Sequence, residues 1–410
     1  MAIGFYRERD LPYLTRDLPG VGGAIKRYDE DFIVEEMPRY DASGEGTHIY
    51  FQIEKRGLTT PAAIRLIAEA LGRRPQEIGY AGLKDAHSVT RQMLSIEHIN
   101  PAKVTGLDLA RVRVVSTSRH TNKIKLGHLA GNRFDIKIRD TAEGAPALAE
   151  PIVERLTARG VPNYFGPQRF GVRGDNALVG LAVLRGDLDS AIALMLGRPS
   201  KFERDDVRRA RELFDRGDLS AAADAWPREL KGPARVCRAL ADGGDPRKAW
   251  RAVDHSLRKL YFSAVQSELF NRVLVRRIDS IDKVQTGDVA WKHVNGACFL
   301  VEDVSIEQPR CEAFEISPTG PLFGKKMKEP TGSPQEIEQQ ALADTKLGAM
   351  QLRAQDGAKL DGARRPLRVP LQDPKLDTGT DNHGRYLRIA FALPPGSYAT
   401  AVTREICKGK

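Results

Sequence analysis

The segment GYAGLKDAHSVTRQ, residues 79–92, combines two glycines with a Lys-Asp pair and a run of hydroxyl, guanidinium and amide side chains. Gly79 and Gly82 allow positive φ and a close approach of the backbone to a ligand. Lys84 and Asp85 would point to opposite faces of a strand, but in a tight loop both could reach one cleft. A positioned carboxylate acts as a nucleophile or a proton acceptor. Taken alone, however, the segment is more typical of a glycine-rich surface turn with an ion pair.

The sequence around this segment predicts β-strands. Phe32 and Val34 alternate with polar neighbours, and Ile49, Phe51 and Ile53 do the same after the loop DASGEGT. Such alternation is typical of strands with one buried face. Further strands are predicted at 111–115, 124–129 and 133–140. The first part of the chain is therefore predicted to be α+β with a mainly antiparallel sheet.

Helices are predicted next to these strands and then dominate the middle of the chain. Thr60 is the predicted N-cap of a helix that ends at Gly72, and another helix is expected near 150–159. After about residue 175 the pattern is helical as far as 277. Gly-Asp recurs at 186, 217 and 244 between apolar-periodic runs, where each Gly can end one helix and each Asp can cap the next. Ordinary helix joints explain these better than a helical repeat.

The last part of the chain returns to strand patterns. Residues 285–330 predict short strands and turns, and residues 331–360 are polar and helical in pattern. RRPLRVP, RYLRIAFALP and YATAVTREI, within 364–406, are predicted as strand-forming. A helical block framed by sheet-forming ends indicates an insertion, with both ends of the chain completing one sheet.

Composition limits the classes of function. The 410 residues are enough for two or three domains, and 64 Lys plus Arg against 54 Asp plus Glu give a net charge of +10. This excess favours a polyanionic partner such as nucleic acid. Four widely spaced cysteines fit reduced thiols. The charged N-terminus is unlike a signal peptide, and no apolar run approaches the roughly 20 residues that span a bilayer, so a cytoplasmic location without a membrane partner is expected.

Several familiar binding motifs are absent or incomplete. GVGGA at 20–24 lacks the third glycine of a dinucleotide fingerprint, and GPLFGKK at 320–326 lacks the spacing of a P-loop. The histidines are scattered, so no metal site is expected. NYFGPQRFG, residues 163–171, could stack unpaired bases on its aromatic rings or close a turn onto the core. RRPLR at 364–368 could contact phosphates, but such clusters are more often solvated surface.

Taken together and in order, the motifs resemble one family. GYAGLKDAHSVTRQ, NYFGPQRFG and DFIVEE occur in one chain with four further motifs, which are YFSAVQSELFN, SPTGPLFG, GARRPLR and FALPPGSYAT. This set closely resembles the TruD family of tRNA pseudouridine synthases from about residue 25 to 406. The resemblance implies a pseudouridine-synthase-type catalytic domain, residues 1–188 and 373–410, with a helix-rich TRUD domain inserted at 189–372.

The resemblance also implies an activity and its residues. Family members isomerise uridine to pseudouridine, typically at position 13 of tRNA, without a cofactor or metal, and a monomer is expected. The catalytic residue is Asp85, which attacks the base, attacks the sugar or promotes deprotonation at the sugar. Phe32, Asn163 and Tyr398 are expected to bind the target nucleotide, and Lys84 is expected to hold Asp85 ionised by charge proximity. The nucleotide must be flipped out of its stack to reach them.

Two other classes of function remain as alternatives. An RNA-binding or tRNA-folding factor could keep the scaffold and lose activity, although the presence of Asp85 argues against it. A carboxylate-based nucleoside hydrolase would need a second acid or base or a metal, and no paired-carboxylate motif is evident.

Overall fold

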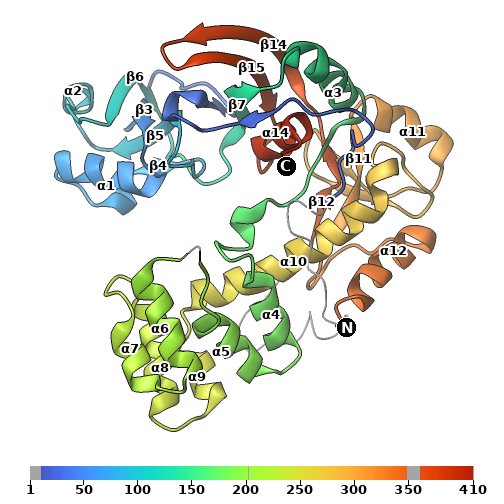
Figure 1. Cartoon of the computed structure of the whole chain (residues 1–410). Helices are drawn as coiled ribbons and strands as arrows, with labels where there is room; N and C mark the ends of the chain where they lie inside the picture. The colour runs from blue at the N-terminus through green and yellow to red at the C-terminus, as the bar shows by residue number, and fades with distance from the viewer. Residues whose placement is uncertain (1–10, 202, 349–360, 410) are drawn as a thin grey trace. The chain divides into compact units, whose positions relative to one another are not determined.

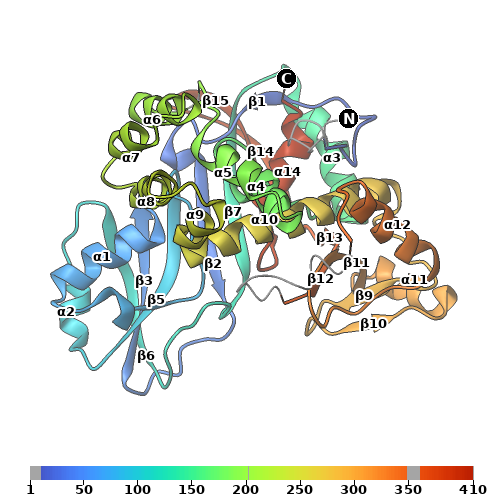
Figure 2. The same cartoon turned by 90° about the horizontal axis from the view of Figure 1, so that it is seen from below.

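The computed structural model describes residues 11–201, 203–348 and 361–409, and in it the chain forms two compact units (Figures 1 and 2). Unit 1 is Pro162–Arg368 with the described N-terminal residues up to Tyr13, and unit 2 is Leu14–Val161 with Val369–Lys410. Two of the three unit boundaries fall within short strands that pair with each other, β8 (Val161–Pro162) and β13 (Arg368–Val369).

Unit 2 is built on a nine-stranded sheet of described residues whose main path runs β14-β15-β7-β2-β5-β3-β6. Only β2 and β5 pair in parallel. The strands are β1 (Gly22–Ala24), β2 (Phe32–Pro38), β3 (His48–Arg56), β4 (Gly79–Tyr80), β5 (Val89–Glu97), β6 (Val112–His120), β7 (Leu129–Thr141), β14 (Gln372–Asp381) and β15 (Gly384–Leu393). Because β15 pairs with β7 along its length, the two ends of the chain complete one sheet, which confirms the predicted α+β class with a mainly antiparallel sheet.

The two faces of this sheet differ in chemistry. Phe32, Val34 and Glu36 of β2 are buried and share one face, here called the helix-side face, while Ile33 and Glu35 point to the opposite face. Helices α1 (Thr60–Ala70) and α14 (Ala399–Cys407) lie on the same side of the sheet (Figure 1). The other helices of unit 2 are α2 (Pro101–Thr105) and α3 (Ala145–Arg159). The helix-side face therefore carries the core, in which Ile64 and Ile67 of α1 pack with apolar residues of β3 and β5.

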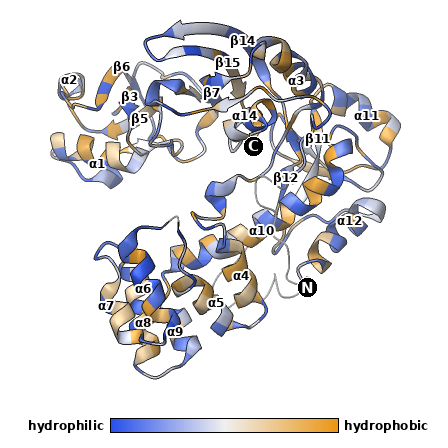
Figure 3. Cartoon of the chain, viewed as in Figure 1, coloured by the Kyte–Doolittle hydropathy of each residue, from blue (hydrophilic) through white to orange (hydrophobic). Residues whose placement is uncertain are grey.

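Unit 1 contains the predicted helical block. Its helices are α4 (Asn176–Leu184), α5 (Leu188–Leu196), α6 (Asp205–Asp215), α7 (Leu219–Ala225), α8 (Lys231–Ala241), α9 (Pro246–Ala252), α10 (His255–Arg277), α11 (Val304–Glu312) and α12 (Gly332–Ala343). Figure 3 shows α4 and α5 as largely hydrophobic and α6 as mainly hydrophilic, so α4 and α5 supply much of the apolar core of this unit. Gly180 of α4 lies so close to α10 that an added Cβ would meet the carbonyl oxygen of Tyr261 at 2.5 Å.

All three Gly-Asp joints are confirmed. Gly186, Gly217 and Gly244 have positive φ, which glycine adopts without steric cost. The aspartates that follow cap α5, α7 and α9, and each accepts a hydrogen bond from a backbone N–H in the first turn of its helix.

A small sheet in unit 1 accounts for the predicted strands of 285–330. Its order is β10-β9-β11-β12, formed by β9 (Val289–Lys292), β10 (Cys298–Leu300), β11 (Ile316–Leu322) and β12 (Ala363–Pro366). Arg364 and Arg368 of the RRPLR motif are buried here: Arg364 pairs with Glu338 at 2.6 Å, and Arg368 donates to the carbonyl of Cys311. These two side chains are structural, so the phosphate-contact interpretation is wrong for them.

Two segments predicted as strands are not strands. Residues 124–128 are irregular, with a turn at 126–127 in which Gly127 has φ +89°, and strand β7 begins only at Leu129. YATAVTREI at 398–406 forms most of α14 instead. Ala399, Val402 and Ile406 are buried at intervals of three and four residues, a helical period that the β-branched composition obscured.

The bounds of the compact units differ from those predicted for the domains. The second segment of unit 1 starts at Pro162, and it includes α4 because α4 packs along α10. The inserted domain at 189–372 stays a prediction about the family-specific segment. In the described residues, no helix is both long enough and apolar enough to cross a membrane. The four cysteines are free thiols.

Candidate active site

Asp85 lies in the loop between β4 and β5, on the helix-side face of the unit 2 sheet. Its side chain is 41% exposed, and its Oδ2 lies 2.7 Å from Nζ of Lys26. The same ammonium lies 4.2 Å from the centroid of the Phe32 ring, over its face. Lys26 follows β1 and has φ +58°, an uncommon conformation for a lysine. A carboxylate that is half exposed and held by one cation is placed to react with an incoming group.

Lys84, the neighbour of Asp85, points elsewhere. Its Nζ lies 2.5 Å from Oε2 of Glu36, and both side chains are buried. A buried ammonium needs an opposite charge, and Glu36 supplies it from β2. Lys26 rather than Lys84 therefore makes the ion pair with Asp85, and Lys84 fixes the loop to the sheet.

The side chains of Thr60 and Gln92 also hold this loop in place. Thr60 Oγ1 accepts a hydrogen bond from the backbone N–H of Lys84 at 2.9 Å and donates to Oε1 of Gln92 at 2.9 Å. The N-cap of α1 is Thr59, whose Oγ1 accepts from the N–H of Ala62. The predicted N-cap role of Thr60 is therefore wrong. The first residue of the helix instead connects the loop to β5.

The two glycines are required because they lack a side chain, and not because they adopt an unusual backbone conformation. Neither Gly79 nor Gly82 has positive φ, so that expectation is wrong. A Cβ on Gly79 would clash with the carbonyl oxygen of Ile124, and a Cβ on Gly82 would lie 3.3 Å from Nζ of Lys84. Gly79 therefore permits close packing against the backbone of Ile124, and Gly82 permits close packing beside the buried lysine.

Lys55 reaches the backbone of Asp85 from β3. Its side chain is fully buried, and Nζ donates to the carbonyls of Leu58 at 2.6 Å and of Asp85 at 2.8 Å. Ser88 Oγ donates to the same Asp85 carbonyl at 3.1 Å. Burial lowers the pKa of Lys55 to about 8, and the nearby Asp85 carboxylate opposes this shift.

The other residues expected at the site fall in different places. Phe32 is buried at the start of β2, and the Lys26 ammonium that pairs with Asp85 lies over its ring. Tyr398 is half-buried at the N-cap of α14 in the same unit. Among the described residues, it makes no hydrogen bond or ring contact with Asp85 or Phe32.

Asn163 belongs to unit 1, and its amide group is already engaged there. Its Nδ2 donates to the carbonyl of Pro366 at 2.9 Å, and its Oδ1 accepts from Arg365 at 2.5 Å. Arg365 also stacks over Phe165, 4.3 Å from the ring centroid. Asn271 of α10 holds this turn through both backbone groups of Phe165. Tyr164 and Phe165 are buried, so NYFG closes onto the core and the base-stacking interpretation is wrong for these two rings.

Comparison with known proteins identifies the family. The family model for tRNA pseudouridine synthase D (TruD) matches residues 9–406. The chain is 48% identical to tRNA pseudouridine synthase D of Geobacter metallireducens, over 97% of this chain and 98% of that protein. It is 37% identical to tRNA pseudouridine synthase D of Thermus thermophilus, over 98% of this chain and 94% of that protein. The chain belongs to the tRNA pseudouridine synthase D family.

A solved structure supports the TruD fold. The crystal structure of the Methanosarcina mazei protein described as tRNA pseudouridine synthase D superposes with a TM-score of 0.82 at 27% identity, and covers 97% of this chain and 96% of that one. The predicted family, fold class and enzyme class, an isomerase, are thereby confirmed.

Two lysines of the candidate site were not predicted from the sequence, although Lys55 lies within the family motif GEGTHIYFQIEKRGLTT, residues 44–60. Lys26 stands outside any recognisable pattern, since only the folded chain brings it to Asp85. Lys55 did carry a signal, because it continues the buried alternation of Ile49, Phe51 and Ile53 on β3. A charged residue in an apolar phase requires a buried partner, and this requirement predicts a functional or structural contact.

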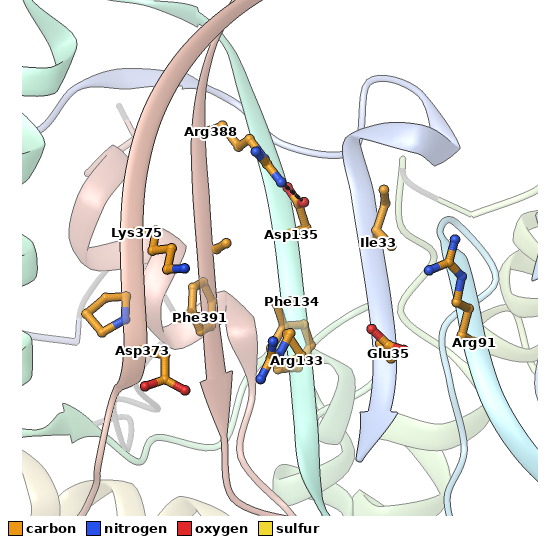
Figure 4. A pocket seen from close by; sticks show the side chains of 12 residues that line it. Ile33, Glu35, Arg91, Arg133, Phe134, Asp135, Asp373, Lys375, Arg388 and Phe391 are labelled. Carbon is orange, nitrogen blue, oxygen red and sulfur yellow. Dashed lines mark hydrogen bonds and ion pairs between the residues drawn. The ribbon is translucent and has the colours of Figure 1, made fainter.

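A hollow of about 520 Å³ lies over the opposite face of the sheet (Figure 4). Its lining carries charges of both signs, from Glu35, Asp135, Asp373, Arg91, Arg133, Lys375 and Arg388. Arg91 pairs with Glu54 at 3.0 Å, and Arg388 pairs with Asp135 at 2.8 Å. Opposite charges on adjacent strands stabilise a sheet, and these two pairs are of that kind.

The described residues of the types that commonly bind metals are not clustered. In the parts of the chain that the structure describes, no three His, Cys, Asp or Glu side chains are grouped so that they could hold a metal ion.

Proposed function

We propose that this enzyme converts uridine 13 of tRNA to pseudouridine, with Asp85 as the catalytic residue. The observation that carries the proposal is the Lys26–Asp85 ion pair of 2.7 Å in the GLKD loop of a chain that TruD matches nearly throughout. The pair orients a carboxylate while part of its surface stays accessible. The reaction breaks the C1′–N1 bond of the nucleotide and forms a C1′–C5 bond, so no atom is gained or lost.

Three further residues are proposed to bind the flipped nucleotide: Phe32, Asn163 and Tyr398. The amide oxygen of Asn163 accepts a hydrogen bond from Arg365, which holds the amide in a fixed orientation. Lys84 is proposed to support Asp85 through the loop. The net charge of +10 suits phosphate contacts along the tRNA. We further propose that the enzyme works in the cytoplasm as a monomer and without a cofactor.

The test uses purified enzyme and a tRNA transcript with uridine at position 13. Pseudouridine is mapped by carbodiimide-dependent stops in reverse transcription for wild type, Asp85→Asn and Asp85→Ala. We expect product at position 13 with wild type and a loss of at least about 10³-fold in rate with both variants, because removing a catalytic nucleophile typically costs this much or more.

Asp135→Asn is the matched control. Asp135 pairs with Arg388 at 2.8 Å on the opposite face of the same sheet, so its amide variant should keep activity within about twofold. Undiminished product with Asp85→Ala would overturn the catalytic assignment. Binding of tRNA by wild type without any product would favour the alternative of an RNA-binding factor.

A further inference from the structure

The backbone carbonyl of Asp85 is the most heavily anchored group of the catalytic loop. Lys55 Nζ donates to it at 2.8 Å, and Ser88 Oγ donates to it at 3.1 Å. Ser88 is itself fully buried, and its hydroxyl lies 3.1 Å from that of Thr90. Two buried donors on one loop carbonyl fix the position of the peptide unit from which the reactive carboxylate extends.

Lys55 connects this carbonyl to the scaffold. It is paired with Thr90 across β3 and β5, so its side chain points to the helix-side face. Its second hydrogen bond, to Leu58 at 2.6 Å, ends on the connection between β3 and α1. The buried ammonium of Lys55 therefore joins three parts of the unit: the end of β3, the entry to α1 and the catalytic loop.

A simple core role would not need an ammonium. The preceding residues of the same phase are apolar, and an apolar side chain at position 55 would avoid the cost of burying a charge. The charge is retained where two carbonyls, from Leu58 and Asp85, converge on Nζ. Unlike a methionine, Lys55 supplies two charged N–H donors, one to the catalytic loop at Asp85 and one to the β3–α1 connection at Leu58.

We propose that Lys55, assisted by Ser88, is a positioning residue for catalysis that holds the Asp85 carboxylate in register with the target nucleotide through the Asp85 carbonyl. This inference rests on the proposed role of Asp85. It assigns no contact with substrate to Lys55, which is buried. A displacement of about 1 Å at a reacting group is enough to lower a rate by about 10²-fold.

The experiment measures the single-turnover rate on tRNA and, separately, the Kd for tRNA, in wild type, Lys55→Met and Ser88→Ala. We expect Lys55→Met to lower the rate by about 10²-fold and Ser88→Ala by several-fold, with Kd changed by less than about twofold in both, since phosphate contacts elsewhere set the affinity. Hydrogen exchange of residues 82–88 should be faster in Lys55→Met.

The matched control is Ile53→Ala. Ile53 lies two residues before Lys55 on the same face of β3 and is fully buried, so its truncation weakens the same core without touching Asp85. We expect the folded control to keep the rate within about twofold and to show no selective exchange at 82–88. Equal losses in Lys55→Met and Ile53→Ala would overturn the inference, because both would then report general destabilisation.

Failure of the inference is distinguishable from failure of the proposed function. An inactive Asp85→Ala beside a fully active Lys55→Met would refute the positioning role alone, whereas an active Asp85→Ala would refute the function on which it rests. If Lys55→Met does not fold, Ser88→Ala decides: a rate within twofold of wild type overturns the inference, and a several-fold loss at unchanged Kd supports it.

Discussion

Lys26 and Lys55 approach Asp85 from two directions and meet different atoms. Lys26 pairs with the carboxylate and is 21% exposed, whereas Lys55 binds the backbone carbonyl and is fully buried. The first lysine contacts the reacting oxygen atoms directly, and the second holds the peptide unit from which they extend. Substitutions at the two positions should therefore have separable consequences.

Lys26→Met should lower the single-turnover rate by about 10- to 100-fold, because the carboxylate loses the cation that orients it. Lys137→Met is a matched control, since Lys137 is equally exposed and pairs with Asp381 at the same 2.7 Å in the same unit. Lys26→Arg should recover part of the activity. The prediction fails if Lys26→Met and Lys137→Met have equal rates on the same tRNA.

The lowered pKa of Lys55, about 8 against an ordinary 10.5, makes stability depend on pH. Between these values the unfolded chain holds a proton that the folded chain has released, so the free energy of unfolding rises with pH in this window. The rise is at most about 3 kcal/mol for one group. Lys55→Met removes it and leaves the other titrations in place.

Urea unfolding at several pH values between 7 and 10.5 measures this effect. The difference in unfolding free energy, wild type minus Lys55→Met, should be smallest below pH 8 and should increase toward pH 10.5. A difference that stays constant across the range would show that Lys55 keeps its ordinary pKa in the folded protein.

At the scale of elements, the crossing of α4 and α10 depends on Gly180. An added Cβ would meet the Tyr261 carbonyl oxygen at 2.5 Å and a methyl group of Val265 at 2.7 Å. Gly180→Ala should therefore destabilise unit 1 by about 1–3 kcal/mol, the usual cost of overpacking. Gly243→Ala, at an exposed position with nothing within 4 Å of the added carbon, should change stability by less than about 0.5 kcal/mol. Equal urea midpoints for the two variants would contradict this account.

Elements were predictable from sequence where a local signal specified them. The three Gly-Asp joints, the alternation of β2 and β3 and the helical block needed only neighbouring residues to be read correctly. The helix α14 was missed because its β-branched residues favour strands, while its burial depends on the sheet that covers it. Either Thr59 or Thr60 could cap α1. Thr60 is engaged by Lys84 and Gln92, which are distant in the sequence, so the cap falls to Thr59.

The candidate site was predictable to a smaller extent. Asp85 followed from its motif, but its ion-pair partner did not, since Lys84 is adjacent in sequence and Lys26 is adjacent in space. Lys84 instead forms an ion pair with Glu36, and this pair requires β2 and the loop to lie close together. Contacts between residues far apart in the chain are set by topology and not by local pattern.

At the scale of the whole molecule, the net charge of +10 predicts how tRNA binding responds to salt. Neutralising phosphates releases counterions, so log K should fall linearly with log salt concentration. Between 50 and 200 mM KCl the affinity of Asp85→Ala for tRNA should fall by at least about tenfold. The inactive variant separates binding from turnover. An affinity that does not change with salt would refute an electrostatic mode of binding.

The position of β15 in the sheet has a consequence for synthesis on the ribosome. β7 ends at Thr141, but its partner β15 begins at Gly384, so one edge of β7 stays unpaired while residues 162–368 of unit 1 are translated. Its buried residues Phe134, Ile136 and Ile138 would be available during that interval to other nascent chains, and unpaired apolar edges favour aggregation. A message truncated before the codon for residue 384 would yield a polypeptide that cannot close this edge, and such a product is a natural client for chaperones or proteases.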